Sequence, residues 1–168
     1  FYLRGVTRDL HADLDEAISV LDLADEGDYR AFLRIHACAL LPLEDGLERG
    51  GVAGTFAPWR AHSRRSALMR DCAAAGIDLA FAELPAIAGA SRQMGVLYVL
   101  EGSRLGGRLL EGRAKSQSGR NAFLRHGRGE PLWADFLSHL ERLPTDAATQ
   151  RDLAEGARLA FGIYGAAA

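Results

Sequence analysis

Five histidines are the residues of this chain best suited to binding a metal ion: His11, His36, His62, His126 and His139. None of them stands three residues after a glutamate, and no H-E-x-x-H segment occurs. The Glu-x-x-His pairs of di-iron helix bundles and the paired histidines of helical zinc sites are therefore missing. A carboxylate-bridged metal enzyme is not expected.

His11 is the strongest candidate ligand among the histidines. It stands beside Leu10 and Leu14 on one face of a predicted helix, where its imidazole can point into a pocket and offer a nitrogen to a bound iron. A histidine on an apolar flank is also commonly a hydrogen-bonded core residue. His36 has the same kind of position on the next predicted helix and competes for the role. The other three histidines have polar or arginine-rich surroundings and are expected on the surface.

A second feature is a glycine-rich segment, residues 93–110, with the sequence Q-M-G-V-L-Y-V-L-E-G-S-R-L-G-G-R-L-L. Its length and neighbours predict a helix, yet each glycine inside a helix costs about 1 kcal/mol relative to alanine. At 100° per residue, three of the glycines fall within about 40° of one another. The result is a stripe without side chains, with Tyr98 and Ser103 at its edges: Gly95, Gly102 and Gly106.

Two interpretations of this stripe remain open from the spacing alone. Small residues four apart allow two helices to approach closely, and they equally allow a flat ligand to lie against the backbone. A phosphate-binding loop is excluded, because the spacing fits neither G-x-G-x-x-G nor G-x-x-x-x-G-K-[ST] and no strand precedes it.

The rest of the chain predicts the helices that must position these residues. Apolar residues recur at steps of three and four, which is typical of amphipathic helices. Helices are expected from about residue 7, over 29–47 across Pro42, over 63–75, over about 86–110, around 133–140 and over 153–164, with loops at 54–59 and 112–129. Strand-like alternation is absent from the sequence. We therefore predict an all-α, single-domain helical bundle over residues 1–168.

The composition excludes several classes of protein. Twenty basic and 22 acidic residues give a net charge of -2, which provides no overall attraction to nucleic acid or anionic lipid. The sequence contains two cysteines, Cys38 and Cys72, too few for a disulfide framework. No apolar run approaches the roughly 20 residues of a membrane span, and no signal peptide is apparent. A cytoplasmic protein is expected.

Together, the two features resemble bacterial haem oxygenases, particularly those associated with bacterial phytochromes. L-R-G-V-T-R-D-L-H-A-D-L-D, residues 3–15, is similar to the opening helix of the family, in which His11 matches the proximal haem ligand. L-Y-V-L-E-G-S-R-L-G-G, residues 97–107, is similar to the distal helix. The F-L-R-I-H-A segment and the W-x-x-F of residues 133–136 follow in the family's order, so the resemblance covers nearly the whole chain.

The resemblance implies an enzyme that opens haem with O2 and reducing equivalents to biliverdin, carbon monoxide and iron. Haem is then both cofactor and substrate, with His11 as the iron ligand. Gly102 and Gly106, with Ser103 and its ordered water, would direct oxygen and protons. The haem-binding residues expected in addition to His11 and these two glycines are Gly107 and, for the propionates, Arg4, Tyr98 and Arg113.

The expected partners follow from what the sequence lacks. No flavin or nicotinamide fingerprint occurs, so electrons are expected from a separate donor such as a ferredoxin or flavoprotein. A bacterial phytochrome is a possible recipient of the product. Ser103 stands where animal members of the family carry an aspartate, which motivates an alternative: a non-catalytic haem-binding sensor or carrier of the same fold. A second alternative is a helical interaction domain in which the glycines pack against a helix and His11 is structural.

Overall fold

Helices form all the regular secondary structure of residues 2–114 and 119–168, the part of the chain described by the structure, which is a computed structural model. In chain order they are α1 (Tyr2–Val6), α2 (Arg8–Ser19), α3 (Glu26–Arg49), α4 (Val52–Thr55), α5 (Trp59–His62), α6 (Arg65–Ala74), α7 (Ala90–Glu111), α8 (Ala122–Arg125), α9 (Leu132–Leu140) and α10 (Ala147–Ala167). The all-α prediction is confirmed. No helix among these residues has the length and apolar character that crossing a membrane requires.

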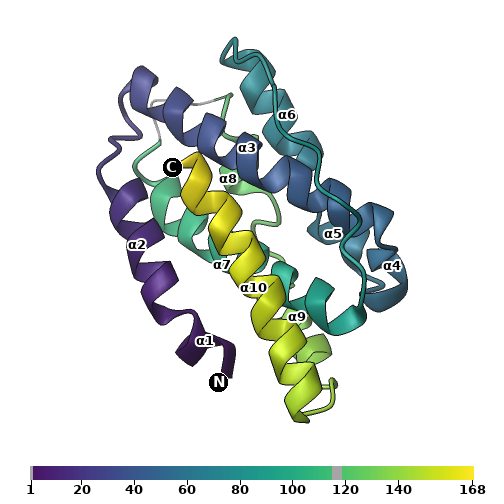
Figure 1. Ribbon diagram of the computed structural model, residues 1–168. Helices are drawn as coiled ribbons and strands as arrows, with labels where there is room; N and C mark the ends of the chain where they lie inside the picture. Colours follow the sequence, from purple (N-terminus) through teal and green to yellow (C-terminus); the bar gives the residue numbers. More distant parts are fainter. Residues whose placement is uncertain (1, 115–118) are drawn as a thin grey trace.

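The centre of the molecule is built by three long helices, α3, α7 and α10 (Figure 1). α10 packs most extensively on α7, and two glycines allow this close approach. A Cβ added at Gly95 of α7 would lie 2.1 Å from the carbonyl oxygen of Leu153, and one added at Gly156 of α10 would lie 2.0 Å from that of Arg92. Each glycine thus faces the backbone of the other helix. Helix packing is the correct interpretation for Gly95.

α3 supplies the largest share of the core. Its first turn is capped by Asp25, whose side chain accepts a hydrogen bond of 3.0 Å from the backbone N–H of Asp28. The helix continues through Pro42, as predicted, although proline removes one backbone hydrogen bond. Pro42 and its leucine neighbours are buried, so packing offsets that loss.

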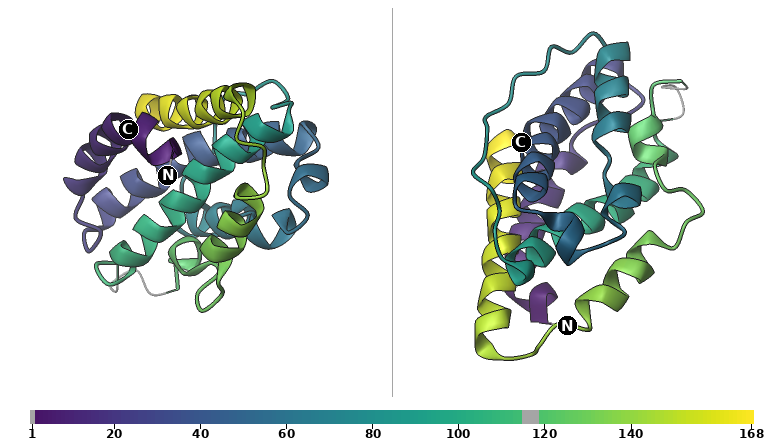
Figure 2. Two further views of the ribbon diagram at one scale, coloured as in Figure 1. Left: turned by 90° about the horizontal axis from the view of Figure 1, so that it is seen from below. Right: turned by 90° about the vertical axis from the view of Figure 1, so that its right-hand side faces the viewer.

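Three expectations about the connections were wrong. The region predicted as a loop at 54–59 contains parts of the short helices α4 and α5. The loop predicted at 112–129 contains the short helix α8, and residues 115–118 of that loop lie outside the described residues. α7 begins at Ala90 rather than near residue 86, because residues 77–88 run without regular structure along the outside of the molecule (Figure 2). Ile87 of this segment is buried against α3, and its N–H donates to the carbonyl oxygen of Gly46 at 2.8 Å. The backbone of Ile87 is therefore held between α3 and α7, since its carbonyl oxygen accepts from the Gln93 side chain at 2.9 Å.

α2 differs from the other long helices in having no buried residue. Its apolar side chains at Leu10, Leu14 and Ile18 are half-buried, although the helix has a pronounced apolar face. A helix of this pattern normally buries that face against a core. In this structure the face borders a cavity.

Candidate functional site

A cavity of about 860 Å³ lies between α2 and α7 and extends inward toward α3, α8 and α10. This volume is within the range of about 300–1,000 Å³ typical of small-molecule sites. Its inner end is lined by buried groups, among them His36, Phe123 and Tyr164, and its α2 side by exposed or half-buried ones. The cavity collects most of the predicted site residues: Arg4, His11, Tyr98, Gly102, Ser103, Gly106 and Gly107.

His11 lines the α2 side of the cavity, and its side chain is 56% exposed. Its Nδ1 lies 2.9 Å from a carboxylate oxygen of Asp15, one helical turn further on. Histidines that ligate metals commonly donate the second ring N–H to a carboxylate in this way, which fixes the tautomer. The ring also stands edge-on to Phe161, with 6.0 Å between centroids. This arrangement leaves Nε2 as the nitrogen suited to ligation.

The glycines of α7 separate into two groups. Gly95 packs against α10, whereas a Cβ added at Gly102 or Gly106 would meet no atom within 4 Å. Gly107 is intermediate, because its added Cβ would lie 3.3 Å from a methyl carbon of Leu124. Helix packing therefore explains one part of the stripe, whereas ligand binding at the other part stays a prediction. The part that lines the cavity leaves the backbone open to a ligand.

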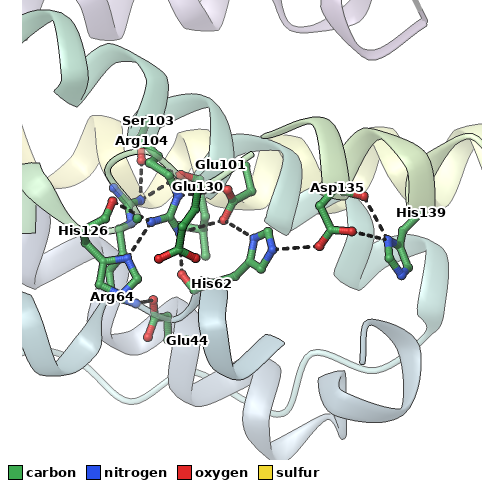
Figure 3. Close-up of polar contacts among 12 residues, drawn as sticks. Glu44, His62, Arg64, Glu101, Ser103, Arg104, His126, Glu130, Asp135 and His139 are labelled. Atoms are coloured by element: carbon green, nitrogen blue, oxygen red, sulfur yellow. Dashed lines mark hydrogen bonds and ion pairs between the residues drawn. The ribbon is translucent and has the colours of Figure 1, made fainter. Parts of the chain in front are cut away.

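Ser103, between the two open glycines, hydrogen bonds to an arginine that the sequence analysis did not single out. Its hydroxyl donates to the carbonyl oxygen of Leu100 at 2.8 Å and accepts from Arg64 Nη2 at 2.6 Å (Figure 3). Arg64 lines the cavity, is only 3% exposed, and holds its guanidinium 4.8 Å from the centre of the Phe123 ring. Burial lowers the pKa of Arg64, and the nearby Arg104 guanidinium lowers it further.

Arg64 is held in place by Glu44 of α3. This buried carboxylate accepts from the Ser63 hydroxyl at 2.6 Å and from the backbone N–H groups of Arg64 and Arg65 at 2.8 and 3.2 Å. These are the amides at the start of α6, where the helix dipole also favours a negative charge. Burial raises the pKa of Glu44, and the hydrogen bonds partly oppose that effect. A glutamate within α3 thus fixes the entry of α6.

His36 lies at the inner end of the same cavity. Its Nδ1 is 3.3 Å from the Tyr164 hydroxyl, and its ring centroid is 4.9 Å from that of Phe123. Burial, followed by the charge of Arg64, lowers the pKa of His36 to about 3. The imidazole is therefore neutral at physiological pH. His36 remains the competitor of His11 for a ligand role.

His62 is buried, so its assignment to the surface was wrong. Its Nδ1 lies 3.1 Å from Glu101 Oε1 and its Nε2 3.3 Å from Asp135 Oδ2 (Figure 3). Glu101, which directly precedes Gly102, also pairs with both Nε and Nη2 of Arg104 at 3.0 Å. Burial alone would raise the pKa of Glu101, but the contacts with His62 and Arg104 lower it to about 2. This cluster fixes the position of α7 next to Gly102.

The other two histidines expected on the surface are half-buried. His126 Nδ1 lies 2.7 Å from Arg104 Nη1, and because an arginine only donates, this nitrogen must accept. Burial and the charge of Arg104 lower the pKa of His126. His139 Nδ1 lies 2.9 Å from the carbonyl oxygen of Asp135, one turn earlier on α9.

The three predicted propionate partners are placed differently. Arg4 is exposed and Tyr98 is half-buried, and both line the cavity. Burial raises the pKa of Tyr98. Arg113 is exposed and is not among the described residues that line the cavity; its Nη2 donates to the carbonyl oxygen of Leu21 at 3.0 Å. Arg8, which the sequence analysis passed over, does line the cavity.

Comparison with known proteins gives matches in sequence and in fold. The chain is 29% identical over 145 residues to a haem oxygenase of Xanthomonas campestris pv. campestris (strain 8004), which covers 83% of this chain and 88% of that protein. The structure matches that of the NO- and CO-bound haem oxygenase from Neisseria meningitidis with a TM-score of 0.84 and 23% identity, over 98% of this chain and 87% of that one. No family model matches the sequence. The fold is that of a haem oxygenase, and the resemblance to bacterial haem oxygenases is confirmed.

Proposed function

We propose that this protein is a haem oxygenase, which uses O2 and reducing equivalents to convert haem to biliverdin, carbon monoxide and iron. The proposal rests on the two sides of the cavity. One is the apolar face of α2 with His11, which the described protein buries only in part, and the other is the stretch of α7 at Gly102 and Gly106 where no side chain protrudes. A large, flat, apolar ligand with an iron centre fits both.

The residues of the cavity are suited to haem. Nε2 of His11 is the ligand that the proposal assigns to iron, with Asp15 fixing the ring. Leu14 and Ile18 would cover the apolar ring on the same side, and the cations at Arg4 and Arg8 would pair with the propionates. Bound haem supplies the iron that activates O2 and is itself the ring that is oxidised.

The remaining tasks fall to α7 and Arg64. The backbone at Gly102 and Gly106 has no side chains that would exclude the ligand, and it would itself form the surface against which one side of the ligand lies. The Ser103 hydroxyl donates to the Leu100 carbonyl, accepts from Arg64 and interacts with the buried Tyr164 hydroxyl, so a water molecule in the cavity would bind next to this polar group. Such a water would carry protons, in place of a carboxylate side chain.

The proposal also requires external partners. Electrons must arrive from a separate donor, either a ferredoxin or a flavoprotein, because the sequence contains no flavin or nicotinamide fingerprint. The expected site of action is the cytoplasm. A bacterial phytochrome that receives the biliverdin is part of the proposal, based on the family resemblance of the two motifs.

A haemin titration followed by reduction tests the proposal. The purified protein should bind one haemin per chain with a histidine-ligated Soret band, and ascorbate in air should then replace that band with biliverdin absorbance. His11→Ala should remove the histidine-ligated spectrum, whereas His36→Leu should retain it. A stable haem complex that is never converted would indicate the sensor or carrier, and failure to bind haemin would indicate the interaction domain.

A further inference from the structure

Arg64 is a buried cation that no carboxylate side chain pairs with directly. Both N–H groups of its Nη2 are used, one on the carbonyl oxygen of Leu100 and one on the Ser103 hydroxyl, at 2.8 and 2.6 Å. Both of these acceptors are neutral. Its Nη1 and Nε have no acceptor among the described residues. The side chain nevertheless lies 97% out of solvent and lines the cavity.

The nearest carboxylates are occupied by other groups. Glu44 accepts from a hydroxyl and from two backbone amides, so it bonds to the main chain of Arg64 rather than to its guanidinium. Glu101 accepts two bonds from Arg104 and lies beside His62. The two buried arginines are therefore unlike: Arg104 has a bidentate carboxylate partner, as buried arginines usually do, and Arg64 has none.

The groups around the Arg64 guanidinium do not supply the missing charge. The ring of Phe123 lies 4.8 Å from it, His36 is neutral, and the buried Tyr164 hydroxyl is an un-ionised phenol. An arginine keeps its proton in proteins even when buried. The inner end of the cavity therefore carries a guanidinium that no carboxylate contacts, and the charges of Glu101 and Glu44 act on it only from further away.

We propose that the inner end of the cavity is a subsite for a small monovalent anion, bound by Arg64 beside Phe123. The effect of this subsite on haem ligands rests on the proposed function, since the inner end would then adjoin the haem face at which exogenous ligands bind. Anionic ligands of azide or formate size should be held more tightly than neutral ones. A haem propionate is the other possible source of negative charge, but Arg4 and Arg8 at the exposed side of the cavity are its expected partners.

The first arm of the test uses the ferric haem complex and azide, followed by the shift of the Soret band. Loss of one charge-assisted hydrogen bond corresponds to a factor of about ten or more in affinity, so Arg64→Gln should weaken azide binding at least about tenfold. Arg64→Lys should retain most of the affinity. Binding of CO to the ferrous complex, a neutral ligand, should change by less than about threefold in both variants.

Arg108→Gln is the matched control. Arg108 is half-buried and, like Arg64, donates from Nη2 to backbone carbonyl oxygen, at Gly127 and Glu130, but it is not among the described residues lining the cavity. Its replacement should leave azide affinity unchanged. Equal azide affinity in the parent chain and in Arg64→Gln would overturn the proposal, and so would an equal loss in Arg108→Gln.

The second arm uses the haem-free protein, so that failure of the proposed function is distinguishable. At constant ionic strength, azide should raise the Tm of the parent chain and of Arg108→Gln, but not that of Arg64→Gln. If haemin does not bind at all, the proposed function fails and this arm alone decides the subsite. An azide effect that is present without haem and disappears once haem is bound would mean that a haem carboxylate occupies the site, which overturns the assignment to a small anion.

Discussion

Gly102→Ala should stabilise the haem-free protein and at the same time weaken haem binding. Replacing a glycine inside a helix by alanine gains about 1 kcal/mol, and the added methyl group at Gly102 meets no atom within 4 Å. A gain of this size raises Tm by about 2–4 °C in a domain of 150–250 residues. Gly95→Ala is the control with the opposite sign, because its Cβ would lie 2.1 Å from the carbonyl oxygen of Leu153. Overpacking of this kind costs about 1–3 kcal/mol, more than the propensity gain.

With haem bound, Gly102→Ala should be unfavourable rather than stabilising. The methyl group projects into the space that the proposed ligand occupies, so accommodating both should cost about 1–3 kcal/mol, or about tenfold or more in haemin affinity. Thermal unfolding of the haem-free variants and haemin titration of each measure the two effects separately. A Gly102→Ala protein that is less stable without haem would refute the open space at this position. One that binds and converts haemin like the parent would refute the contact with haem.

Three further predictions concern the buried charges and the exposed side of the cavity. Glu101→Gln should lower the unfolding free energy by about 3 kcal/mol, because it leaves Arg104 and His62 without their buried partner, whereas Asp135→Asn, at a half-exposed carboxylate, should cost less than about 1 kcal/mol; urea unfolding measures both. Folding lowers the pKa of His36 from 6.5 to about 3, so between these pH values the unfolded chain binds a proton that the folded chain does not. The free energy of unfolding should therefore fall on acidification by up to about 1.4 kcal/mol per pH unit. His36→Leu should remove this pH dependence, and an unchanged pH profile of unfolding would contradict the prediction. Arg4→Gln should weaken haemin binding while Arg113→Gln leaves it unchanged, because only Arg4 lines the cavity; a titration showing the reverse would place the propionates elsewhere.

The long helices were predictable because their apolar residues repeat at the helical period over several turns. The short helices α4 and α5 were not, since four residues provide a single turn and no period. The late start of α7 depends on the contact of Ile87 with Gly46, which is 41 residues away in sequence. Helix content follows from local pattern, whereas these boundaries follow from tertiary contacts.

The site was predictable where its residues belong to a helix with a strong pattern, as at His11 and Gly102. Arg64 was not, because it adjoins a second arginine at the start of a helix, a sequence typical of solvent-exposed charge. Its burial depends on groups from other helices: Glu44 of α3 accepts from its backbone, and Leu100 and Ser103 of α7 accept from its guanidinium. His62 was misassigned for the same reason: its two carboxylate partners come from α7 and α9, and no local spacing indicates them.

The irregular segment at 77–88 divides the chain into two parts that both contribute to the cavity. The part before it provides His11 and Arg64, and the part after it provides Gly102 and Ser103. A cut near Ala82 would interrupt no helix. The two fragments, expressed as separate polypeptides, would meet where α3 packs on α7 and α10 and around the cavity, so that haem bound as proposed would add contacts that join them. Reassembly of a split protein would in that case depend on the concentration of haem.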